Sequence, residues 1–210
     1  MQKIDKEASE TLAHIIASRR DIRGNNFSSK PIGEELLKKI IDAGLHAPSV
    51  GYSQPWKIII IEKNSIKEKI YENYKEEYAK STSSFKERPI YETLKLEGIK
   101  ESPVNIAIFY QKPKRAILGQ TSQKKMGEYS VVCAIQNMWL MARSLNIGMG
   151  WVSILNPKKV RQTLGVSKEY KLIGYLCVGY VKEFPKEPEL KTLNWEKQKK
   201  YQEIVSWIKD

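Results

Sequence analysis

Apolar residues recur at helical spacing in the first part of the chain. In residues 5–18 the apolar positions fall three to four apart, which is typical of an amphipathic helix. A second unit begins at Pro31, and its apolar face predicts a helix that runs to Leu45. A third helix is predicted from Ser65, where Glu68 completes a capping box.

The clearest helical pattern lies in the second half of the chain, at residues 127–145. Two apolar stripes run along this segment, and together they make it apolar nearly all round. A helix of that kind is expected to be the buried central helix of the fold. A shorter helix is predicted from Pro157, since proline suits the first helical position. A C-terminal helix is predicted at residues 194–208.

Runs of β-branched and other apolar residues predict the strands. The predicted strands are residues 57–61, 104–110, 148–154 and 170–181. Residues 111–126 read as a polar loop, whereas residues 81–101 contain Pro89 and are expected to form a mobile lid with a short helix. Helices that flank four or five strands indicate an α/β (α+β) fold, and residues 1–210 fit a single domain.

The composition changes this picture little. Hydrophobic residues make up 41% of the chain and charged residues 29%, as in ordinary globular proteins. No apolar run approaches the roughly 20 residues that cross a bilayer, so no membrane association is expected. Residues 1–10 are polar and of mixed charge, unlike a secretory signal, and a cytoplasmic location is therefore expected.

The net charge of +12 permits a nucleic-acid partner, but the lysines are scattered through amphipathic segments and no binding motif accompanies them. We therefore expect a lysine-rich solvated surface and no nucleic acid. Cys133 and Cys177 each lie in an apolar segment and are expected to be buried thiols. His14 and His46 are the only histidines, too few to build a zinc site, so no metal is expected.

Two segments carry candidate chemistry. Arg19, Arg20 and Arg23 lie at the end of the first helix, and arginine forks match phosphate oxygens two at a time. Residues 47–56 form a loop held by two prolines, with small residues that let a flat ligand approach the backbone. Each segment also has an ordinary interpretation, as a helix end and as a turn. Together they suit a nucleotide-type cofactor with a planar ring.

These segments occur beside three further strings: residues 94–98, 129–136 and 150–155. In this order the strings resemble the nitroreductase superfamily of FMN flavoproteins, and within it the flavin-cleaving 5,6-dimethylbenzimidazole synthase branch. The resemblance covers nearly the whole chain. It implies a mixed sheet in a homodimer, with FMN bound at the subunit interface. One departure is Gln198, which stands where family members often have an arginine.

The resemblance also implies roles for individual residues. Arg19, Arg20 and Arg23 would bind the phosphate and ribityl side of FMN. The flavin ring would lie against residues from two segments: Pro48, Ser49, Val50 and Gln54, and Gly150, Trp151 and Val152. Asp21 and Ser153 would be catalytic, the first beside the ribityl chain and the second beside the central ring. Their alternative roles are an ion-pair partner for Asp21 and a backbone hydrogen bond for Ser153.

The implied reaction takes reduced FMN, supplied by a separate flavin reductase, and molecular oxygen. The flavin is then a substrate, and its fragment 5,6-dimethylbenzimidazole is the lower ligand of cobalamin. Two alternatives remain open from the sequence. One is an NAD(P)H-dependent nitro- or quinone reductase on the same fold, and the other is a non-enzymatic protein that binds flavin or nucleic acid.

Overall fold

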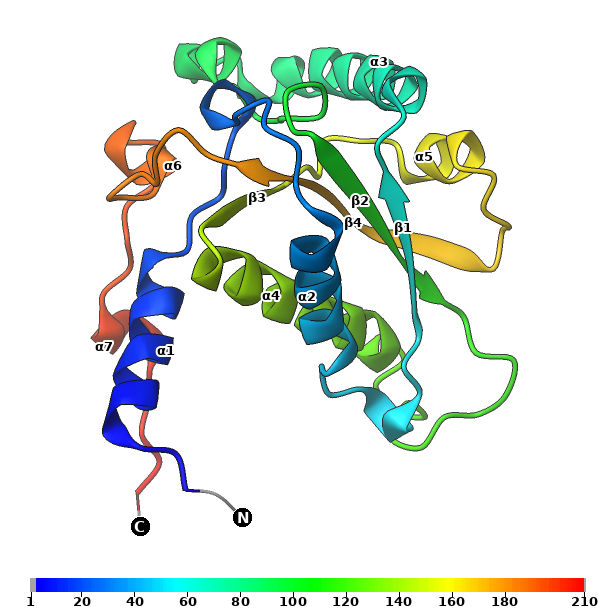
Figure 1. Cartoon of the computed structure of the whole chain (residues 1–210), viewed down its shortest axis with the longest axis vertical. Helices are drawn as coiled ribbons and strands as arrows, with labels where there is room; N and C mark the ends of the chain where they lie inside the picture. Colours follow the sequence, from blue (N-terminus) through cyan, green and yellow to red (C-terminus); the bar gives the residue numbers. More distant parts are fainter. Residues whose placement is uncertain (1–2, 210) are drawn as a thin grey trace.

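A computed structural model of the chain describes residues 3–209 as one layered α/β domain (Figure 1). The helices are α1 (Lys6–Ser18), α2 (Glu34–Leu45), α3 (Asn64–Thr82), α4 (Met126–Ser144), α5 (Pro157–Thr163), α6 (Glu189–Thr192) and α7 (Tyr201–Ile204). The strands are β1 (Trp56–Ile61), β2 (Val104–Gln111), β3 (Ile147–Trp151) and β4 (Tyr170–Tyr180). Short 3₁₀ turns are η1 (Gly24–Asn26), η2 (Val50–Tyr52), η3 (Ser83–Phe85) and η4 (Pro89–Thr93).

The four strands form one sheet in the order β1-β2-β4-β3, with antiparallel pairing between all neighbours. The mixed sheet that the resemblance implies is therefore antiparallel within these strands. A parallel pairing occurs at the outer edge of β3, where Asp21 forms an isolated bridge with Met149. The segment after α1 thus lies against the edge strand, which brings the arginine cluster to the sheet.

The sheet is covered on both faces, α2 and α4 lying on one side and α3 and α5 on the other (Figure 1). Side chains alternate across a strand, and on β2 this sends Ile106 and Ile108 to the α4 side and Phe109 to the α3 side. Both faces are apolar, so β2 is buried almost along its whole length. The α/β (α+β) prediction is confirmed.

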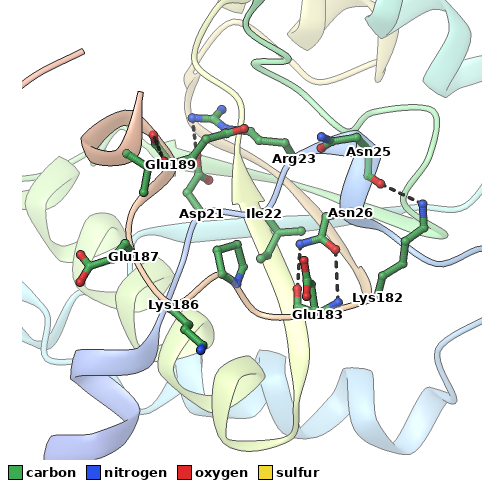
Figure 2. A pocket seen from close by; sticks show the side chains of 12 residues that line it. Asp21, Ile22, Arg23, Asn25, Asn26, Lys182, Glu183, Lys186, Glu187 and Glu189 are labelled. Carbon is green, nitrogen blue, oxygen red and sulfur yellow. Dashed lines mark hydrogen bonds and ion pairs between the residues drawn. The ribbon is translucent and has the colours of Figure 1, made fainter. Parts of the chain in front are cut away.

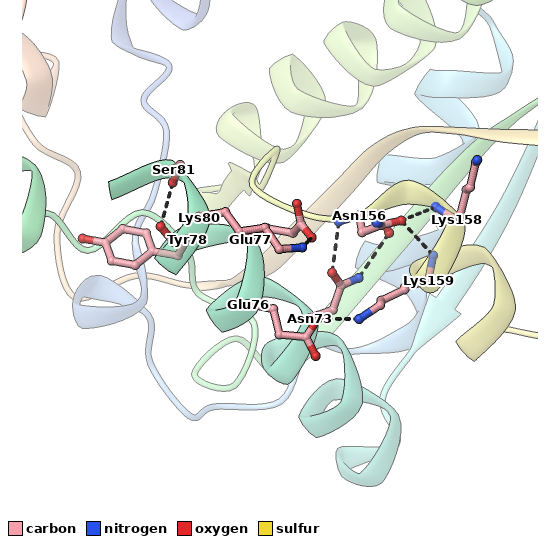
Figure 3. Close-up of polar contacts among 9 residues, drawn as sticks. All are labelled: Asn73, Glu76, Glu77, Tyr78, Lys80, Ser81, Asn156, Lys158 and Lys159. Carbon is pink, nitrogen blue, oxygen red and sulfur yellow. Dashed lines mark hydrogen bonds and ion pairs between the residues drawn. The ribbon is translucent and has the colours of Figure 1, made fainter. Parts of the chain in front are cut away.

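Paired amides attach α5 to α3 (Figure 3). The amide nitrogen of Asn73 donates to the Asn156 carbonyl oxygen at 3.2 Å, and the Asn156 backbone N–H donates to Asn73 Oδ1 at 3.0 Å. The Asn156 side chain also accepts from the backbone N–H groups of Lys158 and Lys159, which caps α5 just before Pro157. The predicted start of this helix is confirmed.

Helix α1 has no buried residue, and its apolar side chains Leu12 and Ile16 are each 52% exposed. It contacts the rest of the domain through α4, where the Arg143 side chain donates to the Ser18 carbonyl oxygen at 3.2 Å. Within residues 3–209, no helix is both long and apolar enough to cross a membrane.

The predicted C-terminal helix at residues 194–208 is wrong. Asn194 adopts a positive φ of 52° after the short α6, and beyond it only Tyr201–Ile204 is helical among the residues up to 209. An amphipathic sequence forms a stable helix when its apolar face packs against something. Here Ile204 and Trp207 are 65% and 73% exposed, so that packing is missing in the single chain.

Three smaller predictions also need correction. Helix α3 begins at Asn64 with Lys63 as its cap and no side-chain capping bond, so Ser65 and Glu68 make no capping box. Strand β3 ends at Trp151, three residues earlier than predicted. Helix α4 is central but is not buried on all sides, because one of its faces is exposed. Cys133 lies on this exposed face, whereas Cys177 is buried as expected.

Candidate functional site

The chain that follows α1 is fastened to the edge strand β3 by backbone bonds. The Ile22 N–H donates to the Met149 carbonyl oxygen at 3.1 Å, and the Trp151 N–H donates to Asp21 Oδ1 at 2.9 Å. The Ile22 side chain is buried, which anchors the segment in the core. These contacts hold the Asp21 carboxylate at a defined place beside β3.

Gly150 is what allows this close approach. A Cβ atom at this position would lie 2.1 Å from the Ile22 carbonyl oxygen, far inside van der Waals contact. Because the obstructing atom belongs to the backbone, it could not rotate away. The glycine in this string therefore has a packing role: it lets the Asp21 segment lie directly against the strand.

Asp21 is surrounded by groups that bind its carboxylate (Figure 2). Its Oδ2 lies 2.7 Å from Nη2 of Arg23, while Oδ1 accepts the Trp151 amide. Burial raises the pKa of the Asp21 carboxyl above its ordinary range, although Arg23 and the Trp151 amide oppose that shift. A partly desolvated carboxylate of this kind can accept a proton more readily than an exposed one.

Arg23 joins three separate segments of the chain. Besides its ion pair with Asp21, its Nη1 donates to the Leu96 carbonyl oxygen at 3.1 Å, and its Nε lies 3.6 Å from Oε2 of Glu189 on α6. The end of the predicted lid is therefore attached to the site. The same segment is also anchored in the core, because Ile99 is fully buried and its N–H donates to the Glu97 carboxylate.

The other two arginines are held differently. Arg20 donates to the backbone carbonyls of Ala17, Arg19 and Lys186, so most of its guanidinium N–H donors are already used within the protein. The Arg19 guanidinium stacks over the Trp139 ring, 4.6 Å from the ring centroid. Among residues 3–209 its side chain has no hydrogen bond or ion pair, which leaves its donors available to a ligand.

Two cavities open on this cluster. One, of 260 Å³, is lined by Asp21, by the three arginines and by the chain around Pro188. The other, of 610 Å³, lies beyond Asp21 and Arg23 (Figure 2). The buried Nε atoms of Arg20 and Arg23 have no hydrogen-bond partner among the described residues. Such unmet donors next to a cavity fit a phosphate or a hydroxyl-rich ligand.

The second predicted segment lies at the other end of α4. The Val50 N–H donates to Oγ of Ser130 at 3.0 Å, and the Gln54 N–H donates to Oγ of Ser49 at 3.1 Å. Ser130 precedes Trp139 by nine residues on α4, a separation of about 14 Å at the helical rise. The single chain therefore does not bring Pro48, Ser49, Val50 and Gln54 next to the arginine cluster.

The remaining predicted residues follow β3. Trp151 is half-buried and packs at 6.4 Å from the Trp139 ring, whereas Val152 is buried and its N–H donates to the Tyr175 carbonyl oxygen. Ser153 is exposed, and its hydroxyl has no hydrogen bond within the described part of the chain. The alternative role of a backbone-bonded strand serine does not apply to it.

Sequence reasoning missed two members of this site. Trp139 stacks on Arg19 and donates its Nε1–H to the Arg20 carbonyl oxygen at 3.2 Å, yet in the sequence it belongs only to an apolar stripe. Glu189 faces Arg23 from α6. No local pattern signals this contact, because the two residues lie far apart in the chain.

The model of the Nitroreductase family matches residues 16–180. A 5,6-dimethylbenzimidazole synthase of Rhodospirillum rubrum is 34% identical over 93% of this chain and 93% of its own length. Among solved structures, a BluB-like flavoprotein from Clostridium difficile 630 superposes with a TM-score of 0.72 at 21% identity, covering 94% of this chain and 99% of that one. A nitroreductase with bound FMN from Bacteroides fragilis has a TM-score of 0.67 at 25% identity, covering 94% and 98%.

Proposed function

This chain belongs to the nitroreductase family, and on that premise we propose that it cleaves reduced FMN with molecular oxygen to release 5,6-dimethylbenzimidazole. The similarity to the Rhodospirillum rubrum synthase along nearly the full length of both chains supports this choice of reaction. A separate flavin reductase would supply the reduced FMN.

The arginine cluster fits the phosphate end of FMN. Arg19 has a free guanidinium fork. The buried Nε of Arg20 has no hydrogen bond among the described residues, and the buried Nε of Arg23 has only the 3.6 Å ion-pair contact with Glu189. We assign the phosphate to Arg19 first, because the forks of the other two arginines are largely occupied by protein atoms. When bound, FMN supplies the redox chemistry, and the protein supplies orientation and proton transfer.

A homodimer completes the flavin site in this proposal. The loop with Pro48, Ser49, Val50 and Gln54 lies about half the length of α4 from the arginines of its own protomer, so it would face the flavin held by the partner. Helix α1 supports an interface, because a 13-residue helix without a buried residue gains little stability in a monomer. The exposed apolar side chains of α1 would be covered there.

The position of the Asp21 carboxylate is the observation that favours cleavage of the flavin over simple reduction of a substrate. It is fixed by Arg23 and by the Trp151 amide, and burial raises its pKa. We propose that Asp21 accepts a proton from the ribityl side of the substrate. Ser153, with its unbonded hydroxyl next to Val152, would orient the reactive part of the ring.

The experiment supplies chemically reduced FMN to the purified protein, admits air and identifies the products by mass. The wild type should release 5,6-dimethylbenzimidazole. Asp21→Asn keeps the shape of the side chain, so it should bind reduced FMN but return only oxidised FMN and peroxide. Glu183→Gln is the matched control, because it removes an exposed carboxylate from the same 610 Å³ cavity.

Two outcomes would contradict the proposal. If the wild type forms no 5,6-dimethylbenzimidazole but turns over NAD(P)H with a nitro compound or a quinone, it is a reductase. If Asp21→Asn releases product at the wild-type rate, Asp21 is only an ion-pair partner for Arg23.

A further inference from the structure

A buried acid lies beside the segment that carries the arginine cluster. Glu97, in the string of residues 94–98, is only 2% exposed, which is unusual for a glutamate. Its Oε2 accepts the Ile99 N–H at 2.7 Å, and its Oε1 forms an ion pair with Lys95. Both bonds join residues of one short stretch, so they fix the backbone between Lys95 and Ile99.

Lys95 keeps this ion pair closed. Its Nζ also lies 2.8 Å from Oε1 of Glu101, an exposed acid. Burial disfavours the charged form of Lys95, but the hydrogen bonds to Glu101 and Glu97 outweigh burial and raise its pKa. Lys95 is therefore a cation at neutral pH, and the buried Glu97 carboxylate faces an opposite charge.

The fixed stretch presents two carbonyl groups to the neighbouring segment. The Leu96 carbonyl oxygen accepts from Nη1 of Arg23 at 3.1 Å, and the Glu97 carbonyl oxygen accepts the Gly24 N–H at 2.7 Å. The approach is close, because a Cβ atom on Gly24 would lie 2.7 Å from the Lys95 side chain. The position of the Leu96 carbonyl therefore depends on the same stretch that Glu97 fixes.

Arg23 passes this constraint on to Asp21 (Figure 2). Its Nη2 lies 2.7 Å from Oδ2 of Asp21, and its side chain is only 15% exposed. A guanidinium group is planar and rigid, so the bond from Nη1 to the Leu96 carbonyl also determines where Nη2 points. A displaced Leu96 carbonyl would turn the Arg23 fork away from the Asp21 carboxylate.

We propose that Glu97 is a positioning residue for Asp21: its carboxylate fixes the stretch that orients the Arg23 guanidinium, and Arg23 orients the Asp21 carboxylate. Glu97 belongs to the lining of neither cavity around Asp21, so it acts through Arg23 and not on the flavin. The consequence for cleavage rests on the proposed function, whereas the effect on Asp21 itself does not.

The first test measures the pKa of Asp21 by carbon-13 NMR titration of its carboxyl group in the full-length protein without flavin. Burial raises this pKa, and Arg23, the Trp151 amide and Arg19 oppose the rise. The buried Cys177 thiol on β4 is the other titratable group that interacts with Asp21. Loss of the correctly placed Arg23 fork should therefore raise the pKa further.

Glu97→Met keeps the length of the side chain and removes both acceptors. The pKa of Asp21 should rise by about 1 pH unit, the lower end of what a neighbouring opposite charge contributes. Glu97→Gln keeps an oxygen for the Ile99 N–H, so it should give a smaller rise, and it carries the test if Glu97→Met does not fold. The direct effect of removing a negative charge has the opposite sign, because it would lower the pKa of Asp21.

Two further variants separate positioning from a general effect on structure. Glu101→Gln is the matched control: it removes the exposed acid that also binds Lys95, and it should leave the pKa of Asp21 unchanged. Arg23→Lys loses the rigid fork, and a lysine cannot bind Asp21 and the Leu96 carbonyl in the same geometry. Adding Glu97→Met to Arg23→Lys should therefore cause no further rise.

The second test gives the same variants chemically reduced FMN in air. Glu97→Met should release 5,6-dimethylbenzimidazole at least about tenfold more slowly than the wild type, because its carboxylate at position 21 is misplaced. FMN affinity should change little, since Arg19 binds the phosphate. Glu101→Gln should release product at the wild-type rate.

Three results would overturn the inference: an unchanged or lowered pKa of Asp21 in the folded Glu97 variants, the same rise in Glu101→Gln, or a further rise when Glu97→Met is added to Arg23→Lys. A wild type that forms no 5,6-dimethylbenzimidazole would instead refute the proposed function. The NMR titration would still decide the role of Glu97, because it involves neither flavin nor oxygen.

Discussion

Replacing Gly150 by alanine should destabilise the protein through one backbone contact. The new Cβ would meet the Ile22 carbonyl oxygen at 2.1 Å and the Ile22 carbonyl carbon at 3.3 Å. Neither atom can swing aside, so the segment that carries Asp21 must move away from β3. That movement breaks the Ile22–Met149 backbone bond and the bond between the Trp151 amide and Asp21.

The cost follows from those two bonds. A neutral backbone hydrogen bond contributes about 1 kcal/mol and one to a carboxylate about 1.5–3 kcal/mol, so Gly150→Ala should lose roughly 2–4 kcal/mol. Domains are stable by only about 5–15 kcal/mol in total. A loss of this size should therefore lower the urea concentration at the unfolding midpoint by a clearly measurable amount.

Gly33→Ala is the matched control, because a Cβ there meets no atom within 4 Å. Its stability should stay within about 1 kcal/mol of the wild type. If Gly150→Ala is as stable as Gly33→Ala but binds FMN poorly, the glycine faces the flavin, as the resemblance implies, and the packing argument is refuted.

Two further predictions concern the cluster. Arg19→Ala should weaken FMN binding by about tenfold or more in a fluorescence titration, while losing at most about 1 kcal/mol of stability with its contact to Trp139; equal affinities would remove Arg19 from the phosphate site. The pKa of Asp21 is raised in the folded state above its ordinary 3.8, so the folded protein holds this proton more tightly than the unfolded chain. The free energy of unfolding of the wild type, compared with that of Asp21→Asn, should therefore be greatest at low pH and fall as the pH rises through the raised pKa. If this difference instead grows with pH, the ion pair with Arg23 outweighs burial.

Local periodicity was enough to predict most of the secondary structure. Helices α1, α2 and α4 lie close to where the spacing of apolar residues predicts them, and each of the four strands overlaps a predicted apolar run, although β3 ends three residues early and α3 begins without the predicted capping box. The same logic failed at residues 194–208, whose apolar residues find no surface in one protomer. The fold class thus follows from the pattern of the sequence, and the family from the resemblance of its strings to the nitroreductase superfamily.

The candidate site depended on contacts between distant parts of the chain. The sequence placed three arginines together, but the tertiary structure occupies the forks of Arg20 and Arg23 and leaves that of Arg19 free. It also separates the Val50 loop from this cluster by about half the length of α4, and it makes Gly150 a packing contact for Ile22. The sequence determined which groups are available. Only the fold decided which of them meet, because those contacts depend on how the helices and strands pack.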